Sequence, residues 1–330
     1  MTQRILVTGG AGFIGSHIVD ELLRRGHHPI VFDNESTGTR ANLPSGVEFI
    51  PGDVCDSDAL KTVFESGVDA VMHLAGQASI RISFANPDAD LNVNTLGTVR
   101  VLQQCLAYRV PRLIFASTMT VYGDTPVTPT PEDAPPNPIS FYAVTKYAAE
   151  RYVHITAARG DLDFEFHATA LRMFNVYGPR QRLNNPYQGV LAIFIGNVMR
   201  GEPIKIFSDG EQSRDFVHAV DAAKAWADAL DNPATYGQSI NIGTGVGTSV
   251  NQLCDYVVNA FGHTRDTYPV QYFPTHPGDM RHSRADISRA KALIGWSPQI
   301  DMAEGMAETV AWARQEAARE EKQRAMSDKQ

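Results

Sequence analysis

Thr8-Gly9-Gly10-Ala11-Gly12-Phe13-Ile14-Gly15 follows a short apolar run and precedes a segment with helical spacing of its apolar residues. A turn from a strand into a helix needs residues with free φ, and the three glycines spaced three apart supply it. Bare backbone also lets a pyrophosphate approach the helix N-terminus, whose N–H groups carry partial positive charge. The stretch therefore predicts a dinucleotide-binding turn; the alternative is a glycine turn that serves close packing only.

Short apolar or β-branched runs alternate with helical segments on both sides of this turn and onward to about residue 175. Strands separated by helix-length connections are typical of right-handed βαβ units. The predicted fold class is α/β, a doubly wound parallel sheet of the Rossmann type. The expected strands are Arg4–Thr8, Pro29–Asp33, Glu48–Pro51, Ala70–Leu74, Leu113–Ser117 and Phe166–Arg172, and the expected helices are His17–Arg25, Asp58–Ser66, Asp90–Tyr108 and Tyr142–Arg159.

The pattern loosens after residue 175, where turn signals such as Tyr177-Gly178-Pro179 and Ser208-Asp209-Gly210 separate shorter segments. We therefore predict a dinucleotide-binding domain over residues 1–175 that includes a Tyr/Lys helix. A smaller mixed α/β lobe over residues 176–315, interleaved with the first, would bind the substrate in a cleft between the two. The highly charged residues 316–330 would form a solvated helical tail.

Composition limits the classes of function. The chain has 330 residues, 43% of them hydrophobic and 20% charged, which is ordinary globular usage. A net charge of −8 disfavours bulk attraction to nucleic acid or to a membrane surface. No apolar run approaches a membrane span and no signal-peptide pattern opens the chain, so a cytoplasmic location is expected.

The number and spacing of the cysteines and histidines indicate neither disulfides nor a metal site. Cys55, Cys105 and Cys254 are odd in number and lack C-x-x-C spacing, so we expect them to pack in the core. The histidines His73, His154, His218 and His282 show no metal-ligand spacing. No metal site is predicted.

Asp33 ends the second predicted strand 18 residues after Gly15. This spacing suits a carboxylate that accepts a hydrogen bond from a ribose 2′-hydroxyl and repels a 2′-phosphate. No Arg occupies positions 34–39, although Arg40 is not far. NAD is therefore favoured over NADP; the alternative is that Asp33 only caps a helix or lies in a loop.

Tyr142 and Lys146 stand four residues apart, on one face of a predicted helix. A Tyr side chain, with an ordinary pKa of about 10, becomes a base at neutral pH only when a nearby cation favours its phenolate. Lys146 and the positive nicotinamide ring of NAD⁺ could provide that field. The alternative is a packed Tyr beside a solvated Lys.

A set of motifs in a fixed order extends from about residue 3 to residue 300. Together they resemble an extended short-chain dehydrogenase/reductase, and within that family the UDP-galactose (UDP-glucose) 4-epimerase group. The motifs are Thr8–Gly15, Asp33, Gly52-Asp53-Val54, His73-Leu74-Ala75-Gly76, Ser117-Thr118-Met119-Thr120-Val121-Tyr122-Gly123, Tyr142 with Lys146, Asn175-Val176-Tyr177-Gly178-Pro179-Arg180-Gln181, Asp209–Phe216 and Pro277-Gly278-Asp279-Met280-Arg281.

The resemblance implies roles for individual residues. Tyr142 would shuttle the proton, Thr118 would hydrogen-bond the reacting sugar hydroxyl, and Lys146 would bind the nicotinamide ribose while lowering the Tyr pKa. The cofactor-binding set would be Gly9, Gly12, Phe13, Ile14, Gly15, Asp33, Asn34, Asp53, Val54, Leu74, Ala75, Gly76, Asn94, Tyr142, Lys146 and Phe174. The substrate-binding set would be Thr118, Asn175, Val190, Phe207, Arg214, Phe216, Val250, His276, Asp279 and Ser283.

Five positions where family members differ refine this expectation. Met119 and Thr120 stand where related dehydratases and decarboxylases carry an acid, so dehydration is disfavoured. Asn175 stands where a UDP-glucuronate 4-epimerase typically has a Thr, so that activity is less expected. His276 stands where family members usually have an Arg, so an ionic contact to the diphosphate is lost and the identity of the nucleotide base is left open. Arg281 could replace that contact. The alternative is that His276 is simply an exposed loop residue. The small Ser283 predicts room for an N-acetyl group beside the sugar.

The expected function is an NAD-dependent isomerase that interconverts UDP-glucose and UDP-galactose through a 4-keto sugar, with the N-acetylhexosamine pair as a further expected substrate. Another NAD-dependent sugar-nucleotide enzyme, such as a 2-epimerase or ketoreductase, is the first alternative. A non-catalytic dinucleotide sensor is the second, although it would not need Tyr142, Lys146 and Thr118. The resemblance also implies a homodimer formed through the helices Asp90–Tyr108 and Tyr142–Arg159.

Overall fold

The computed structural model describes residues 2–183, 189–274 and 281–327. Its centre is a seven-stranded sheet with strand order β11-β6-β5-β4-β1-β2-β3, and every neighbouring pair is parallel. The predicted doubly wound Rossmann sheet is confirmed. The strands are β1 Arg4–Thr8, β2 His28–Asp33, β3 Glu48–Pro51, β4 Ala70–His73, β5 Arg112–Thr118, β6 His167–Met173 and β11 Ser239–Ile242.

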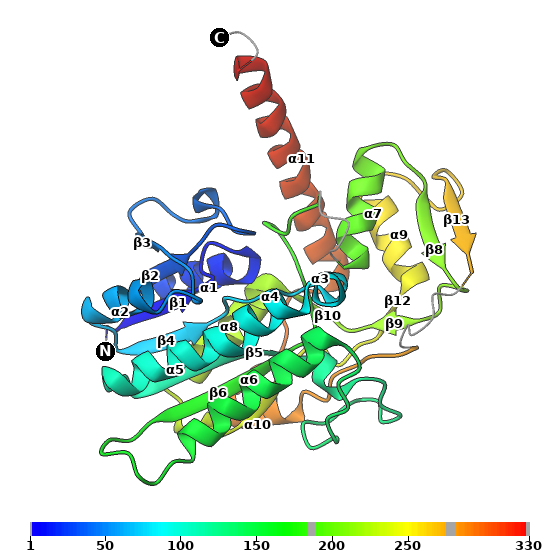
Figure 1. Cartoon of the computed structure of the whole chain (residues 1–330). Coiled ribbons are helices and arrows are strands. Elements are labelled where there is room, and N and C mark those ends of the chain that lie inside the picture. The colour runs from blue at the N-terminus through cyan, green and yellow to red at the C-terminus, as the bar shows by residue number, and fades with distance from the viewer. Residues whose placement is uncertain (1, 184–188, 275–280, 328–330) are drawn as a thin grey trace.

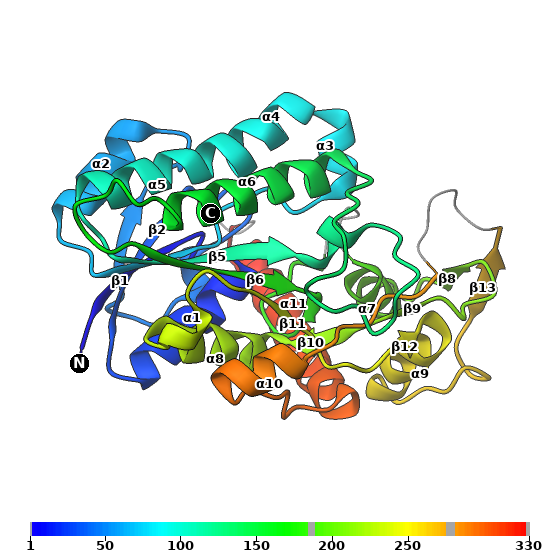
Figure 2. The same ribbon diagram turned by 90° about the horizontal axis from the view of Figure 1, so that it is seen from below.

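Helices cover both faces of the sheet in two layers (Figure 2). Each layer buries an apolar cluster against the strands, because a strand buried on both faces carries apolar side chains on both. One layer holds α1 Phe13–Arg24, α8 Ala219–Leu230 and α10 Ser288–Ile294, and the other holds α2 Ser57–Glu65, α5 Gly97–Ala107 and α6 Phe141–Ala157. Cys105 and Cys254 are buried as expected, whereas Cys55 is only half-buried.

The predicted helix Asp90–Tyr108 is interrupted. Short helices α3 Ile80–Ala85 and α4 Pro87–Leu91 lead into a π turn, η2 Asn92–Leu96, before α5 begins. A π turn adds one residue to the helical repeat and is frequent at functional sites. It changes which side chains face α6.

A third apolar cluster lies beyond the sheet, in the part of the chain that follows β6 (Figure 1). Its strands form small pairs, β7 with β10, β8 with β13 and β9 with β12. The elements are β7 Asn175–Tyr177, α7 Val190–Met199, β8 Ile204–Phe207, β9 Ser213–Arg214, β10 Phe216–His218, β12 Thr248–Ser249, α9 Val250–Ala260, β13 Val270–Phe273 and α11 Met302–Ser327. The proposed domain limits at residues 175 and 315 stay a prediction.

The two parts of the chain are interleaved. Residues beyond 175 return to the sheet as β11, which pairs with β6, and as α8, which packs against α1. In the described residues no helix is both long and apolar enough to cross a membrane.

Candidate active site

The glycine-rich turn between β1 and α1 leaves no room for side chains. Gly9 has φ +71°, and a Cβ there would lie 2.8 Å from the Ala75 backbone nitrogen. A Cβ at Gly15 would lie 2.2 Å from the Gly9 carbonyl oxygen. Helix α1 begins at Phe13, directly after Gly12. Its first N–H groups are thus accessible to an anion, as the sequence predicted for a pyrophosphate.

Asp33 joins this turn to the end of β2. Its side chain is 7% exposed, and its Oδ2 accepts a hydrogen bond of 3.0 Å from the Ala11 N–H. Its Oδ1 accepts one of 2.7 Å from the Glu35 N–H. Burial raises the pKa of this carboxyl, while the main-chain hydrogen bonds oppose the rise. The guanidinium of Arg40, the first Arg after Asp33 in the sequence, lies 3.8 Å from the centroid of the Phe49 ring. Arg40 therefore makes a cation–π contact with Phe49.

The other predicted cofactor residues gather at the carboxyl ends of neighbouring strands, where ligands bind in doubly wound folds. Asn34 donates to Asp53 over 2.8 Å. The loop Leu74-Ala75-Gly76 follows β4, and Ala75 N–H donates to Thr8 Oγ1 over 3.2 Å. Val54 follows the end of β3, and its side chain is 4% exposed and packs within the apolar cluster, so in the predicted set only its backbone would face the cofactor.

Asn94 lies on the π turn and is 1% exposed. Its Oδ1 accepts from the Gln77 N–H at 2.9 Å, and its Nδ2 donates to Asp90 Oδ1 at 3.0 Å. A Cβ at Gly76 would meet Asn94 Oδ1 at 2.8 Å. The π turn therefore brings Asn94 against the loop after β4, as the cofactor set requires.

Tyr142, Lys146 and Thr118 come together where α6 crosses the end of β5. Tyr142 is half-buried, and Thr118 and Lys146 are 7% and 5% exposed. Thr118 hydrogen-bonds the Tyr142 hydroxyl. The Lys146 Nζ lies 4.3 Å from the centroid of the Phe115 ring, a cation–π contact from β5. Burial lowers the pKa of Lys146 to about 7, against the opposing charges of Glu150 and Asp90.

The surrounding protein residues do not by themselves lower the pKa of Tyr142, because burial raises it to about 12. The Thr118 hydrogen bond acts in the opposite direction, and the Asp90 charge adds to the rise. Burial penalises the charged phenolate, and this penalty outweighs the stabilisation of the phenolate by the Thr118 hydrogen bond. The expected joint effect of Lys146 and NAD⁺ on this pKa stays a prediction.

Ser283 and Phe174 border the segment after β5. Ser283 is 7% exposed and its Oγ lies 3.5 Å from Met119 Sδ. Phe174 packs in a small cluster with Met119 and Tyr122. Asn175 Oδ1 is buried and has no hydrogen-bond partner among the described residues, which leaves an acceptor for a ligand.

The predicted nucleotide-binding residues come from separate small elements. Val190 and Val250 begin α7 and α9, and Phe207 ends β8 with its ring centroid 5.6 Å from that of Phe273. Arg214 in β9 pairs with Thr248 in β12, which brings it close to the start of α9. Phe216 in β10 is buried in the same cluster as Val250. His276 and Asp279 lie outside the described residues.

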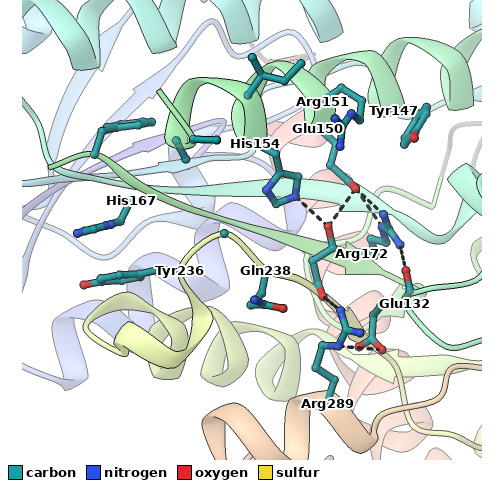
Figure 3. A pocket seen from close by; sticks show the side chains of 16 residues that line it. Glu132, Tyr147, Glu150, Arg151, His154, His167, Arg172, Tyr236, Gln238 and Arg289 are labelled. Atoms are coloured by element: carbon teal, nitrogen blue, oxygen red, sulfur yellow. Dashed lines mark hydrogen bonds and ion pairs between the residues drawn. The ribbon is translucent and has the colours of Figure 1, made fainter. Parts of the chain in front are cut away.

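Sequence reasoning missed a buried ionic cluster on the same helix. Glu150 and Arg172 are 1% and 5% exposed and form an ion pair beside a cavity of about 640 Å³ (Figure 3). The cavity is lined by residues of α6, β6 and β11, among them His154, together with Glu132 from a loop and Arg289 of α10. The spacing of four from Lys146 to Glu150 is the signal that could have found it.

Comparison with known proteins places this arrangement in a family. The model of the NAD dependent epimerase/dehydratase family matches residues 5–243. A UDP-glucose 4-epimerase from Mycolicibacterium smegmatis is 40% identical over 318 residues, covering 94% of this chain and 99% of that protein. The resemblance inferred from the ordered motifs is confirmed.

Solved structures agree with the sequence match. The UDP-glucose 4-epimerase of Thermotoga maritima, solved with UDP-glucose, is 40% identical and covers 95% of this chain and 99% of its own, with a TM-score of 0.88. The Thermus thermophilus UDP-glucose 4-epimerase, solved with NAD, is 38% identical and covers 94% and 99%, with a TM-score of 0.85. This chain therefore belongs to the NAD-dependent epimerase/dehydratase family, as a nucleotide-sugar epimerase of the extended short-chain dehydrogenase/reductase type whose cofactor is NAD.

Proposed function

We propose that this enzyme interconverts UDP-glucose and UDP-galactose by oxidising and re-reducing C4 of the hexose. The contact between the Tyr142 hydroxyl and Thr118 carries the proposal, because it pairs a proton acceptor with a hydrogen-bonding group at the cofactor edge of the sheet. Met119 and Thr120 follow Thr118, and neither side chain transfers a proton at neutral pH. The site thus supports oxidation at C4 without elimination of water.

Tyr142 removes the proton of the sugar 4-hydroxyl, and Thr118 shares the hydrogen bond to that oxygen. Bound NAD supplies the hydride acceptor, and in its oxidised form a positive charge that favours the phenolate. Lys146 would add its own positive charge while its ammonium persists, and it would donate to the ribose of bound NAD. After the 4-keto sugar turns over and C4 regains the hydride on its other face, Tyr142 returns the proton to the C4 oxygen.

The predicted nucleotide contacts lie far from Tyr142 in the sequence, on the β8, β9 and α9 elements. Arg214 would neutralise the diphosphate, and Phe207 would flank the base ring. Holding the nucleotide firmly leaves the hexose free to present either face, and binding energy from the remote part positions the ring. We propose UDP as the nucleotide on the resemblance and on the relatives solved with UDP-glucose.

We further propose that the site accepts N-acetylhexosamines. Ser283 is small, and the wall opposite it is the flexible Met119 side chain at 3.5 Å. Methionine fills irregular space and yields more readily than a branched or aromatic side chain. A Ser at this place leaves volume near C2 of the sugar.

We also propose that two copies pair through α6. Phe141, Val144, Tyr152 and Ile155 are 46%, 48%, 50% and 57% exposed and follow one face of this helix. Phe84 of α3 extends this apolar stripe, since its ring lies 5.1 Å from that of Phe141. A second copy with the same stripe would bury it. Replacing Ile155 with Arg should shift the mass measured by light scattering from dimer to monomer; an unchanged mass would reject this surface.

A panel of UDP-glucose, UDP-galactose, UDP-N-acetylglucosamine and UDP-glucuronate tests the activity. We expect the first two to equilibrate without added NADH, with deuterium at C4 retained in the product. Tyr142→Phe should lower turnover by about three orders of magnitude, because the proton acceptor is lost.

Tyr152→Phe provides the matched control. It removes a hydroxyl from an exposed tyrosine on the same helix and should leave turnover unchanged. No interconversion of any pair by the wild-type enzyme, or full activity of Tyr142→Phe, would reject the proposal. Consumption of added NADH would favour a ketoreductase.

A further inference from the structure

Glu150 stands one helical turn after Lys146 and two turns after Tyr142, so the three side chains share one face of α6. The Glu150 side chain is almost fully buried, at 1% exposed. Burying a carboxylate is costly unless hydrogen bonds and an opposite charge compensate for it. Neither the family comparisons nor the predicted site residues give this residue a role.

Glu150 is tied to three strands of the sheet. Ser117 Oγ on β5 donates to its Oε2, and Arg172 Nε on β6 donates to the same oxygen at 3.1 Å. Ser239 Oγ on β11 donates to Oε1 at 3.0 Å. Figure 3 shows Glu150 pointing from α6 toward Arg172. One carboxylate therefore connects the helix to the three strands at one side of the sheet.

The contact with Ser117 reaches the proposed catalytic group. Ser117 directly precedes Thr118 at the end of β5, and Thr118 hydrogen-bonds Tyr142 back on α6. Glu150, Ser117, Thr118 and Tyr142 thus close a ring between one helix and one strand. Shifting α6 along β5 would break either the Glu150 contact or the Tyr142 contact.

Glu150 also sets the charge around Lys146. The groups that act on Lys146 are Asp90 of α4, Glu150 of α6, His73 of β4 and the Phe115 ring of β5. His73 is neutral, since burial lowers its pKa to about 3. Burial would raise the pKa of Glu150, but hydrogen bonds from Arg172 and Ser117 hold it below its ordinary value, with help from the nearby His154. Glu150 is therefore an anion at neutral pH.

We propose that Glu150 is a positioning residue for the reaction, which fixes Thr118 relative to Tyr142 through Ser117 and increases the fraction of Lys146 in its ammonium form. The proposal rests on the proposed function for its catalytic consequence, and on the placement of two buried charges four residues apart on α6 for its effect on Lys146. Arg172 is the partner that makes an ionised Glu150 tolerable, because its guanidinium is 5% exposed and contacts both carboxylate oxygens.

The titration of Lys146 tests the electrostatic part without any assay of activity. The chain has seven lysines, and ¹³C labelling at their ε carbons lets NMR follow each, with Lys146→Met assigning the signal of interest. In the wild type we expect the Lys146 signal to titrate near pH 7. In Glu150→Gln the midpoint should move about one pH unit lower, because the negative charge that favours the ammonium is gone.

Kinetics test the consequence for the reaction. At pH 7, Glu150→Gln should lower kcat about tenfold with KM within about twofold, since the nucleotide contacts lie elsewhere. The alkaline limb of the kcat profile should move to lower pH along with the Lys146 midpoint. Ser117→Ala keeps the charge and removes the link to β5, so we expect kcat to fall severalfold with no movement of the limb.

Asp221→Asn is the matched control for a structural effect. Asp221 is also fully buried, and its Oδ2 accepts from the Gln299 and Ile300 N–H groups at 2.7 and 2.8 Å, away from Lys146. This variant should lose stability and leave the Lys146 midpoint unchanged. An unmoved midpoint in Glu150→Gln overturns the electrostatic role, and an unchanged kcat in Ser117→Ala overturns the positioning role. Should Glu150→Gln not fold, Ser117→Ala decides the proposal.

The two proposals fail in different ways. If the wild type epimerises no nucleotide sugar, the proposed function fails, while the Lys146 titration still reports on Glu150. If the wild type is active and neither Glu150→Gln nor Ser117→Ala behaves as stated, only the role of Glu150 is rejected.

Discussion

The cofactor side and the nucleotide side of the site are built in different ways. The cofactor side uses β1, β2 and the turn between β1 and α1, where Gly9, Gly15 and Asp33 lie within 25 residues of one another. The nucleotide side takes Val190, Phe207, Arg214 and Val250 from separate helices and two-stranded sheets. The first side is fixed by backbone contacts inside one βαβ unit, and the second by packing between distant segments. A substitution should therefore be least tolerated on the cofactor side.

Gly15→Ala should have the largest effect. Its Cβ would lie 2.2 Å from the Gly9 carbonyl oxygen and 2.7 Å from Gly10 Cα, and backbone on both sides cannot yield. We expect the protein to lose co-purified NAD and about 3 kcal/mol of unfolding free energy, measured by urea denaturation. Gly160→Ala is the control, because nothing described lies within 4 Å of its added Cβ. NAD retained by Gly15→Ala would contradict the rigid-turn account.

Asp33→Ala should rank second. It removes the acceptor of the Ala11 and Glu35 N–H groups and the predicted ribose contact. We expect NAD affinity to fall about tenfold or more by calorimetry. Asp56→Ala makes a matched control, since Asp56 also accepts from two main-chain N–H groups, those of Asp58 and Ala59, at the start of α2. Equal loss of NAD affinity in both variants would assign the effect to general destabilisation.

Ser283→Tyr tests the substrate side, where packing is looser. Because Ser283 faces Met119, a phenol ring should fill the space near the sugar C2 group. We expect turnover of UDP-N-acetylglucosamine to fall at least about tenfold relative to UDP-glucose, measured as the ratio of kcat/KM values. Ser283→Ala should keep the wild-type ratio. An unchanged ratio in Ser283→Tyr would remove this residue from the specificity wall.

Arg281→Ala should have the smallest effect. Its two terminal guanidinium nitrogens, Nη1 and Nη2, donate to the Asp209 carboxylate at 2.7 and 2.8 Å, in an exposed ion pair. Exposed pairs contribute little, and a paired guanidinium is less free to hold a diphosphate. We expect KM for UDP-glucose to stay within about twofold. A tenfold rise in KM would show that Arg281 leaves Asp209 to bind the substrate.

The same contrast explains how much of the fold could be predicted. The expected strands and helices before residue 175 are found to within a few residues. Each of them is signalled locally, by the spacing of its apolar residues and by the turn residues at its ends. The π turn Asn92–Leu96 was not visible, since a single extra residue barely alters that spacing. Strand β11 was also missed, because four residues whose partner is β6 give no local signal.

The site divides in the same way. Glycine spacing and Asp33 follow from local geometry, and the structure brings both to the predicted turn. The direction of the Tyr142 pKa could not be read from a Tyr/Lys spacing, because burial decides it. Glu150 was not among the predicted site residues, because its burial arises only from contacts with three strands that are distant in the sequence.

Strand β11 has a consequence for synthesis of the chain. The outer side of β6 gains its partner only after residues 239–242 have been translated, because β11 supplies that partner. A nascent chain that ends before them exposes a strand edge open to association with other chains. Stalled or truncated products of this gene should therefore aggregate, even when every glycine of the cofactor turn is already in place.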